Sequence, residues 1–355
     1  MSELNSNKGS AVVGFAAAIV IVYGMQMAKD LLVPFLIAVF LALISVRPML
    51  WLQKKRVPSF LAALMIVSAI LMILGVLGTI LGSSIAEFTA ALPGYQAKLD
   101  VIVDGVFDFA VKHLNGDESI ESLGDMIDPG WAMGLAATFL NSLRGVLTNT
   151  FLIVFTMIFM LLEASSVETK VSAAFGRSAE SMERPREFLH NLGRYLGIKT
   201  IVSTATGICA GILTSTIGLD FPLLWGMLAF LLNYIPTIGS IIAAVPAVLL
   251  ALVQLGPGAA SATAMGFAGL NVVFGNIVEP RLMGYGVGIS PLIVFVGLFF
   301  WGWVFGPVGM LLSVPLTMTL KLIFESDEST RWIAILIGSE RDAQYALDKR
   351  ADEQA

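Results

Sequence analysis

The chain has 355 residues, of which 57% are hydrophobic and only 13% are charged, and its mean hydropathy is +0.85. These values lie outside the range of soluble globular domains and indicate a membrane protein. One cysteine excludes an intrachain disulfide, two histidines argue against a metal site, and the net charge of −5 matters less than where the charges lie.

Three membrane spans are predicted at the N-terminal end of the chain, after a polar, cytoplasmic segment at residues 1–10. A crossing needs about 20 apolar residues, and residues 11–83 contain three such runs, at 11–28, 31–52 and 60–83. The short loop after the second run carries Lys54, Lys55 and Arg56. Because positive charges gather on the cytoplasmic side, this loop is expected there.

Residues 84–145 are then expected to lie outside the cytoplasm, and they hold nine acidic residues against three basic ones. Apolar residues alternate at steps of three and four, which is the pattern of a helical seam. The seam comprises Ile85, Phe88, Leu92, Tyr95, Leu99, Ile102, Val106 and Phe109. Pro93 is expected to kink or restart this helix. A second, shorter amphipathic piece ends at Asp128-Pro129. The seam predicts a scaffold that packs within the subunit, against a neighbouring subunit or on the bilayer surface.

The middle and the end of the chain continue the same alternation of apolar runs and charged segments. A fourth span is predicted at 146–163, a fifth at 198–217 and a sixth at 258–278. Residues 164–197 are predicted to form a basic, amphipathic cytoplasmic segment, and residues 325–355 a cytoplasmic tail. The charge count behind this assignment covers residues 164–199, which carry six basic residues: Lys170, Arg177, Arg184, Arg186, Arg194 and Lys199. Both termini are therefore expected in the cytoplasm.

Two further apolar stretches, 221–255 and 290–324, are each broken in the middle by proline and glycine. An interior proline removes backbone hydrogen bonds, and lipid offers no water to replace them. Such breaks therefore occur at membrane depth where they are buried in protein or line a cavity. Paired interrupted segments favour a transport path in residues 198–324. The alternative is that the prolines only serve helix packing.

The halves of the broken stretches are short. Residues 221–235 and 291–305 contain fifteen residues each, or about 22 Å of helix against a hydrocarbon core of about 30 Å. They are either tilted crossings or re-entrant hairpins, which gives between six and ten crossings. The predicted fold is an all-α polytopic membrane protein with about eight transmembrane helices, two broken hairpins and an extracytoplasmic amphipathic helical segment.

Polar residues gather at the end of the sixth span, where Asn271, Asn276, Glu279 and Arg281 lie close in sequence. Pro280 is expected to end the helix there and to place the two charges at its mouth. In one interpretation Glu279 takes up a proton or cation while Arg281 or the asparagines bind a polar solute. In the other, Arg281 is an interfacial charge that sets topology, and Glu279 is its counter-ion.

The breaks themselves supply the other candidate path residues. The first break contributes Asn233, Pro236, Thr237 and Gly239, and the second contributes Ser290, Gly306, Pro307, Gly309 and Ser313. All nine of these residues are uncharged, which suits a small polar solute. Asn233 and Thr237 have a structural alternative, since they could bond the backbone groups that Pro236 leaves free.

Several motifs are missing from the sequence. It has no Gly-rich phosphate loop followed by Lys-Ser/Thr, no His-Glu-x-x-His and no Gly-x-Ser-x-Gly. It also has no basic face on a folded soluble domain, which excludes nucleic-acid binding. A non-enzymatic protein without cofactor or metal is therefore expected.

Three segments around the breaks and the polar cluster form long motifs. They are Leu232-Asn233-Tyr234-Ile235-Pro236 with Ile238-Gly239-Ser240, then Asn276-Ile277-Val278-Glu279-Pro280-Arg281-Leu282-Met283-Gly284, and the segment from Phe300 to Leu316. These motifs resemble those of the autoinducer-2 exporter family of bacterial membrane permeases. The similarity extends from the span that contains Pro34 to about Leu336.

The resemblance implies an inner-membrane permease that exports the furanose-derived quorum-sensing signal autoinducer-2. It implies that H⁺, Na⁺ or the signal's own gradient drives export, and that the protein is a homo-oligomer, with a pentamer as the expected number. Some relatives resemble Na⁺(Li⁺)/H⁺ antiporters, and such an antiporter would need a titrating carboxylate, for which Glu279 is the main candidate. A third hypothesis, a membrane scaffold without transport, leaves the broken helices unexplained.

Overall fold

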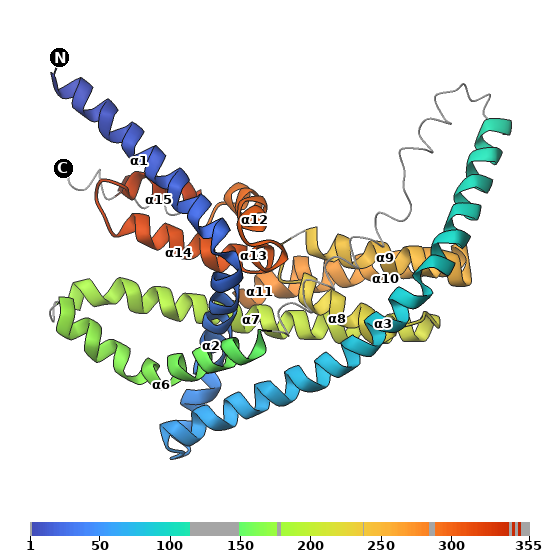
Figure 1. Cartoon of the computed structure of the whole chain (residues 1–355), viewed down its shortest axis with the longest axis horizontal. Coiled ribbons are helices and arrows are strands. Elements are labelled where there is room, and N and C mark those ends of the chain that lie inside the picture. The colour runs from blue at the N-terminus through green and yellow to red at the C-terminus, as the bar shows by residue number, and fades with distance from the viewer. Residues whose placement is uncertain are drawn as a thin grey trace. The chain divides into compact units, whose positions relative to one another are not determined.

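The computed structural model describes residues 2–113, 149–175, 179–236, 238–283 and 288–340, with residues 343–344 and 347–348 of the tail. Every regular element in these residues is a helix (Figure 1). The predicted all-α class is therefore confirmed.

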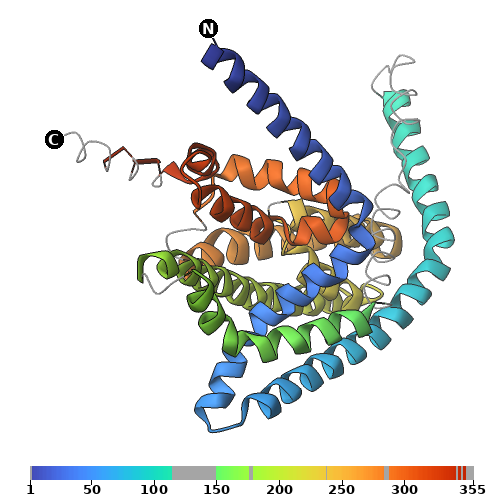
Figure 2. The ribbon, with the colours of Figure 1, turned by 60° about the vertical axis from the view of Figure 1, so that its left-hand side comes forward.

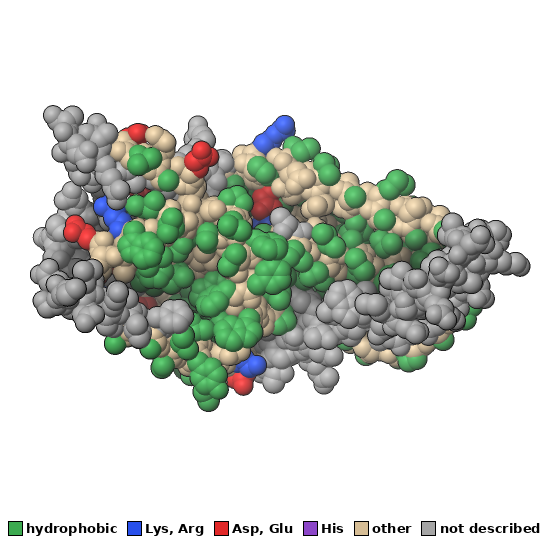
Figure 3. Space-filling model, turned by 90° about the horizontal axis from the view of Figure 1, so that it is seen from above, with side chains coloured by type: hydrophobic (Ala, Val, Ile, Leu, Met, Phe, Trp, Pro, Cys, Tyr) green, Lys and Arg blue, Asp and Glu red, His purple; other side chains and the backbone are tan. Residues whose placement is uncertain are grey.

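The described helices have the length and surface of a multi-pass membrane protein. Five apolar segments are long enough to cross a bilayer: Lys29–Lys54, Ser59–Ala91, Glu187–Ile217, Ile238–Leu255 and Pro257–Met283. Four shorter apolar helices lie at Ala16–Met27, Thr150–Glu163, Pro222–Leu232 and Pro291–Phe305. Large apolar side chains cover much of the surface in Figure 3, and the side chain of Phe151 is 80% exposed. Such exposure suits lipid rather than water. The number of crossings and their sidedness stay predictions.

The chain divides into two compact units. The first comprises residues 1–67, 149–193 and 287–355. Its helices are α1 (Ser2–Met27), α2 (Lys29–Lys54), α6 (Thr150–Phe175), α12 (Pro291–Phe305), α13 (Pro307–Leu311), α14 (Ser313–Glu325) and α15 (Arg331–Ile337). Its core is formed by Trp301, Val304 and Phe305 of α12, against which apolar residues of α1 and α2 pack.

The second unit comprises residues 68–148 and 194–286. It holds most of α3 (Ser59–His113), the later part of α7 (Ala179–Ile217), α8 (Pro222–Leu232), α9 (Ile238–Leu255), α10 (Pro257–Leu270), the π-helix η1 (Asn271–Val278) and α11 (Glu279–Met283). The side chains of Trp225, Leu228 and Leu232 on α8 are almost fully buried. Helix α8 is therefore mostly buried.

Four of the described helices begin with proline at their first position. They are α8 at Pro222, α10 at Pro257, α12 at Pro291 and α13 at Pro307. A helix start is where the missing N–H of proline costs least. Gly256 and Gly306, which precede two of these prolines, have φ of 92° and 70°, a region that glycine enters without strain. The prolines thus separate one helix from the next.

Helix α3 continues through Pro93 without a break, and its long course is seen in Figure 2. Of the two alternatives for Pro93, the restart is therefore wrong, because one helix continues through the proline; the kink stays a prediction. The side chains of Leu92, Leu99, Ile102, Val106 and Phe109, and the second amphipathic piece at 120–128, lie outside the described residues.

Two residues of the predicted seam, Phe88 and Tyr95, contact other residues of the same subunit. Phe88 is fully buried, and its ring meets the edges of Phe221 and Trp225 at centroid distances of 6.0 Å and 5.7 Å. The hydroxyl of Tyr95 donates to Asp220 Oδ2 over 2.9 Å. Burial, and then the bond to Asp220, raise the pKa of Tyr95 to about 12. At these positions the seam therefore packs within the subunit.

Candidate functional site

The site in the second unit is built on a close crossing of α7 and α8. Gly207 and Gly211 form a Gly-x-x-x-Gly pair on α7 and face Gly226 of α8. A Cβ added to Gly207 would lie 2.7 Å from the carbonyl oxygen of Gly226. A Cβ added to Gly226 would likewise lie 2.7 Å from the carbonyl oxygen of Gly207. Small residues allow helix backbones to approach in this way in membranes.

One buried face of α7 is polar. Lys199, Ser203, Thr206 and Thr214 follow one another at helical spacing, and each is at most 9% exposed. The hydroxyls of Thr206 and Thr214 donate to the carbonyl oxygens of Val202 and Ala210, one turn earlier. Lys199 and Ser203 bond to other segments.

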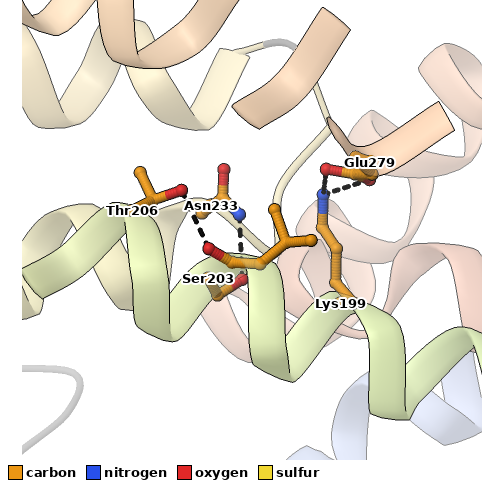
Figure 4. Close-up of polar contacts among 6 residues, drawn as sticks. Lys199, Ser203, Thr206, Asn233 and Glu279 are labelled. Atoms are coloured by element: carbon orange, nitrogen blue, oxygen red, sulfur yellow. Dashed lines mark hydrogen bonds and ion pairs between the residues drawn. The ribbon is translucent and has the colours of Figure 1, made fainter. Parts of the chain in front are cut away.

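The segment that ends α8 is bonded to this face. Asn233 Nδ2 donates to Ser203 Oγ over 2.9 Å (Figure 4). The hydroxyl of Tyr234 donates to Thr200 Oγ1 over 2.8 Å. Two neighbouring residues of the break therefore hold it against α7.

The stretch 221–255 forms an antiparallel hairpin with this break at its tip. The backbone N–H of Asp220, just before α8, donates to Oε1 of Gln254 near the end of α9, over 3.0 Å. At the tip, a Cβ added to Gly239 would overlap the carbonyl oxygen of Leu232. Pro236 lies in the turn between the two helices, and Thr237 lies outside the described residues. The tip is thus closed by direct contact of two backbones.

A buried ion pair lies on the same face of α7. Lys199 Nζ donates to both carboxylate oxygens of Glu279, over 2.6 Å and 2.8 Å (Figure 4). The side chains are 5% and 17% exposed. Glu279 therefore has Lys199 as its counter-ion, and the interpretation that paired it with Arg281 is wrong. Residues two apart on a helix do not face each other, and Arg281 is exposed.

Lys199 was also misassigned, since it was counted as a charge of the cytoplasmic segment. It lies within the apolar segment Glu187–Ile217 and is 4% exposed. The sequence did contain a usable signal. Ser203 and Thr206 follow Lys199 at four and seven residues, so three polar residues share one face of an apolar helix.

Glu279 directly follows η1, and its backbone N–H donates to the carbonyl of Phe274, five residues earlier. π-Helical turns are rare and are frequent at functional sites. The helix then continues as α11 to Met283, so the expectation that Pro280 ends it is wrong. Pro280 stands at the second position of α11. Asn276 is exposed on η1.

A small cavity lies beside the hairpin tip, with a volume of about 20 Å³, which is room for one water-sized molecule. Four polar residues line it, and all four are uncharged: Thr206, Asn233, Ser240 and Asn271. Its apolar wall consists of Ala229, Ala243, Phe267 and Leu270. Two of the predicted path residues, Asn233 and Asn271, thus meet at one cavity.

The first unit contains a second hairpin of the same construction. The ammonium of Lys321, late in α14, donates to the carbonyl of Gly288 over 2.7 Å, which brings the end of the hairpin to its beginning. Gly306 and Pro307 form the break between α12 and α13. A Cβ added to Gly309 would overlap the carbonyl oxygen of Trp301. Both tips therefore require glycine at a backbone contact.

The two serines predicted in this stretch have different surroundings. Ser290 precedes α12, and its backbone N–H donates to the carbonyl of Ile337 over 3.0 Å. Ser313 is 1% exposed, and its hydroxyl has no hydrogen-bond partner in the part of the chain that the structure describes. Thr317, one turn later, accepts from the indole of Trp301 over 3.0 Å.

Comparison with known proteins identifies the family. The family model described as AI-2E family transporter matches residues 15–327. The chain belongs to the AI-2E transporter family. The AI-2 transport protein TqsA of Escherichia coli strain K12 is 36% identical over 326 residues, which cover 92% of this chain and 94% of TqsA.

Two more AI-2E relatives have names that state transport without a solute. A protein of Haemophilus influenzae is 36% identical over 343 residues, covering 95% of this chain and 99% of its own length. YhhT of Escherichia coli strain K12 is 33% identical over 326 residues, which cover 92% of this chain and 93% of YhhT. The predicted family is confirmed, and the protein is a membrane transporter of the AI-2E family.

Proposed function

We propose that the protein exports autoinducer-2, or a similar small polar metabolite, across the bacterial inner membrane. The observation that carries this proposal is the set of uncharged hydroxyl and amide residues around the small, otherwise apolar cavity at the first hairpin tip. Hydroxyl and amide groups from α7, the α8 end, α9 and η1 converge there: Thr206, Asn233, Ser240 and Asn271. Such groups bind neutral hydroxylated solutes and leave no charge without a partner. The name of TqsA supports AI-2 as the solute.

The remaining path residues are part of the same proposal. Pro236, Gly239, Gly306, Pro307 and Gly309 shape the two tips, and Thr237, Asn276, Glu279, Arg281, Ser290 and Ser313 stay candidate contacts along the path. The proposed arrangement has cytoplasmic termini, the domain boundaries predicted from the sequence and a homo-oligomer, with five subunits as the expected number. An H⁺ or Na⁺ gradient is the proposed driving force.

Na⁺(Li⁺)/H⁺ antiport is the hypothesis with less structural support. It needs a carboxylate that is free to exchange a proton for a cation. The main candidate, Glu279, has both carboxylate oxygens bonded to Lys199. No observation among the described residues favours antiport over export.

Extracellular AI-2 tests the proposed export. A host that makes AI-2 but has its own exporters of this family deleted is compared with and without this chain. We expect the AI-2 level in the medium to rise, and the cellular level to fall, when the chain is expressed. Equal levels in the two strains, with the chain present in the membrane fraction, would contradict the proposal.

A further inference from the structure

The buried charges of the second unit cancel. Lys199 is the one charged residue among the described residues that is buried, and Glu279 neutralises it through two hydrogen bonds. A buried pair of this kind has no net charge, whereas either partner alone is an uncompensated charge in a medium of low dielectric.

The pair and the cavity share two structural elements. On α7, Lys199 and Thr206 lie on the same buried face, seven residues apart, which is about 10 Å along the helix. The second shared element is η1, which begins at the cavity residue Asn271 and ends just before Glu279. Figure 4 shows Lys199, Ser203 and Thr206 in sequence along α7, with Asn233 and Glu279 facing them. An unbalanced charge at the pair would therefore act on a solute that passes the cavity.

We propose that the Lys199–Glu279 pair sets the charge selectivity of the solute path. With both charges present, the path accepts uncharged polar solutes and disfavours anions and cations alike. Charges that line a pore or cleft select solutes of the opposite charge. Removal of one partner therefore gives the path a net charge and a preference for solutes of the opposite charge. This inference rests on the proposed function, because it assumes that solute passes the cavity.

Single substitutions are expected to shift the preference in opposite directions. Lys199→Met leaves the carboxylate and should favour cations, whereas Glu279→Gln leaves the ammonium and should favour anions. At about 10 Å inside a protein, one unit charge changes the relative occupancy of charged and neutral solutes by roughly tenfold. The measurement is efflux from proteoliposomes of AI-2 and three labelled probes of similar size: ribitol, ribonate and 1-amino-1-deoxyribitol.

Two further variants cover the case in which a single substitution prevents folding. The exchange Lys199→Glu with Glu279→Lys keeps the net charge at zero and should keep the preference for ribitol. Asn271→Asp adds a carboxylate of the same shape to the cavity, leaves the pair intact and should favour the cationic probe. The control is Lys170→Met, which breaks the exposed ion pair with Glu163 and should change no preference.

The outcomes separate this inference from the proposed function. A wild-type protein that moves ribitol but not AI-2 contradicts AI-2 export and supports the neutral path. The inference is overturned if the wild type prefers a charged probe or moves neither AI-2 nor ribitol. It is also overturned if folded variants with a changed net charge keep the wild-type preference.

Discussion

Alanine at Gly309 is expected to destabilise the second hairpin by about 3 kcal/mol or more, at the upper end of what overpacking costs. The added methyl group overlaps the carbonyl oxygen of Trp301 and comes within 2.9 Å of Phe305 Cβ. A carbonyl in a helix cannot rotate away as a flexible side chain can. The tip has to open, and the contact that closes it is lost.

Gly239→Ala should have the same effect on the first hairpin, because its methyl group overlaps the carbonyl oxygen of Leu232. Thermal unfolding of the purified protein in detergent measures both variants. Gly24→Ala and Gly269→Ala are matched controls, since a Cβ at either position meets nothing within 4 Å. Alanine in an open helical position should be neutral or stabilising, by about 0.5–1 kcal/mol. If all four variants unfold alike, the two tips are not closed as described.

Removal of one partner of the Lys199–Glu279 pair is expected to have the second large effect on stability. Removal of one partner of a buried ion pair costs about 3–5 kcal/mol, because the other charge stays buried without compensation. Lys199→Met and Glu279→Gln should each lower the free energy of unfolding by about this amount. The double variant should recover most of the loss, since it removes both charges.

A double-mutant cycle measures this coupling directly, from the unfolding of the wild type, the two single variants and the double variant. We expect the double variant to be far more stable than the sum of the single losses predicts. Strict additivity would show that the two residues do not interact, which would contradict the ion pair.

The breaks were predictable because their causes are local. Proline at the first position of a helix and glycine at a backbone contact act within a few residues, so Pro222, Pro307, Gly239 and Gly309 marked both hairpins. The sequence could not show which residues the tip would contact. The bond from Asn233 to Ser203 joins residues thirty positions apart and depends on the crossing of α7 and α8.

The charges were harder to place than the breaks. Counting basic residues treats every lysine as a loop residue, so Lys199 was assigned to the cytoplasmic segment although it is buried. One of the two sequence-based interpretations pairs Glu279 with Arg281, which is near it in sequence, but helical geometry separates residues two apart. The backbone hydrogen bonds of the π-helix that precedes Glu279 join residues five apart instead of four, and no pattern in the sequence indicates it.

The central claim is that AI-2 passes the uncharged cavity at the first hairpin tip, and efflux of AI-2 from proteoliposomes tests it most directly. Asn271→Leu removes an amide from the cavity at nearly constant size, and Asn191→Leu makes the same change at an exposed position of α7. The account predicts AI-2 efflux from the wild type and from Asn191→Leu, and at least a roughly tenfold loss in Asn271→Leu, as for a lost polar contact to a substrate. Equal efflux from folded Asn271→Leu and Asn191→Leu would contradict it.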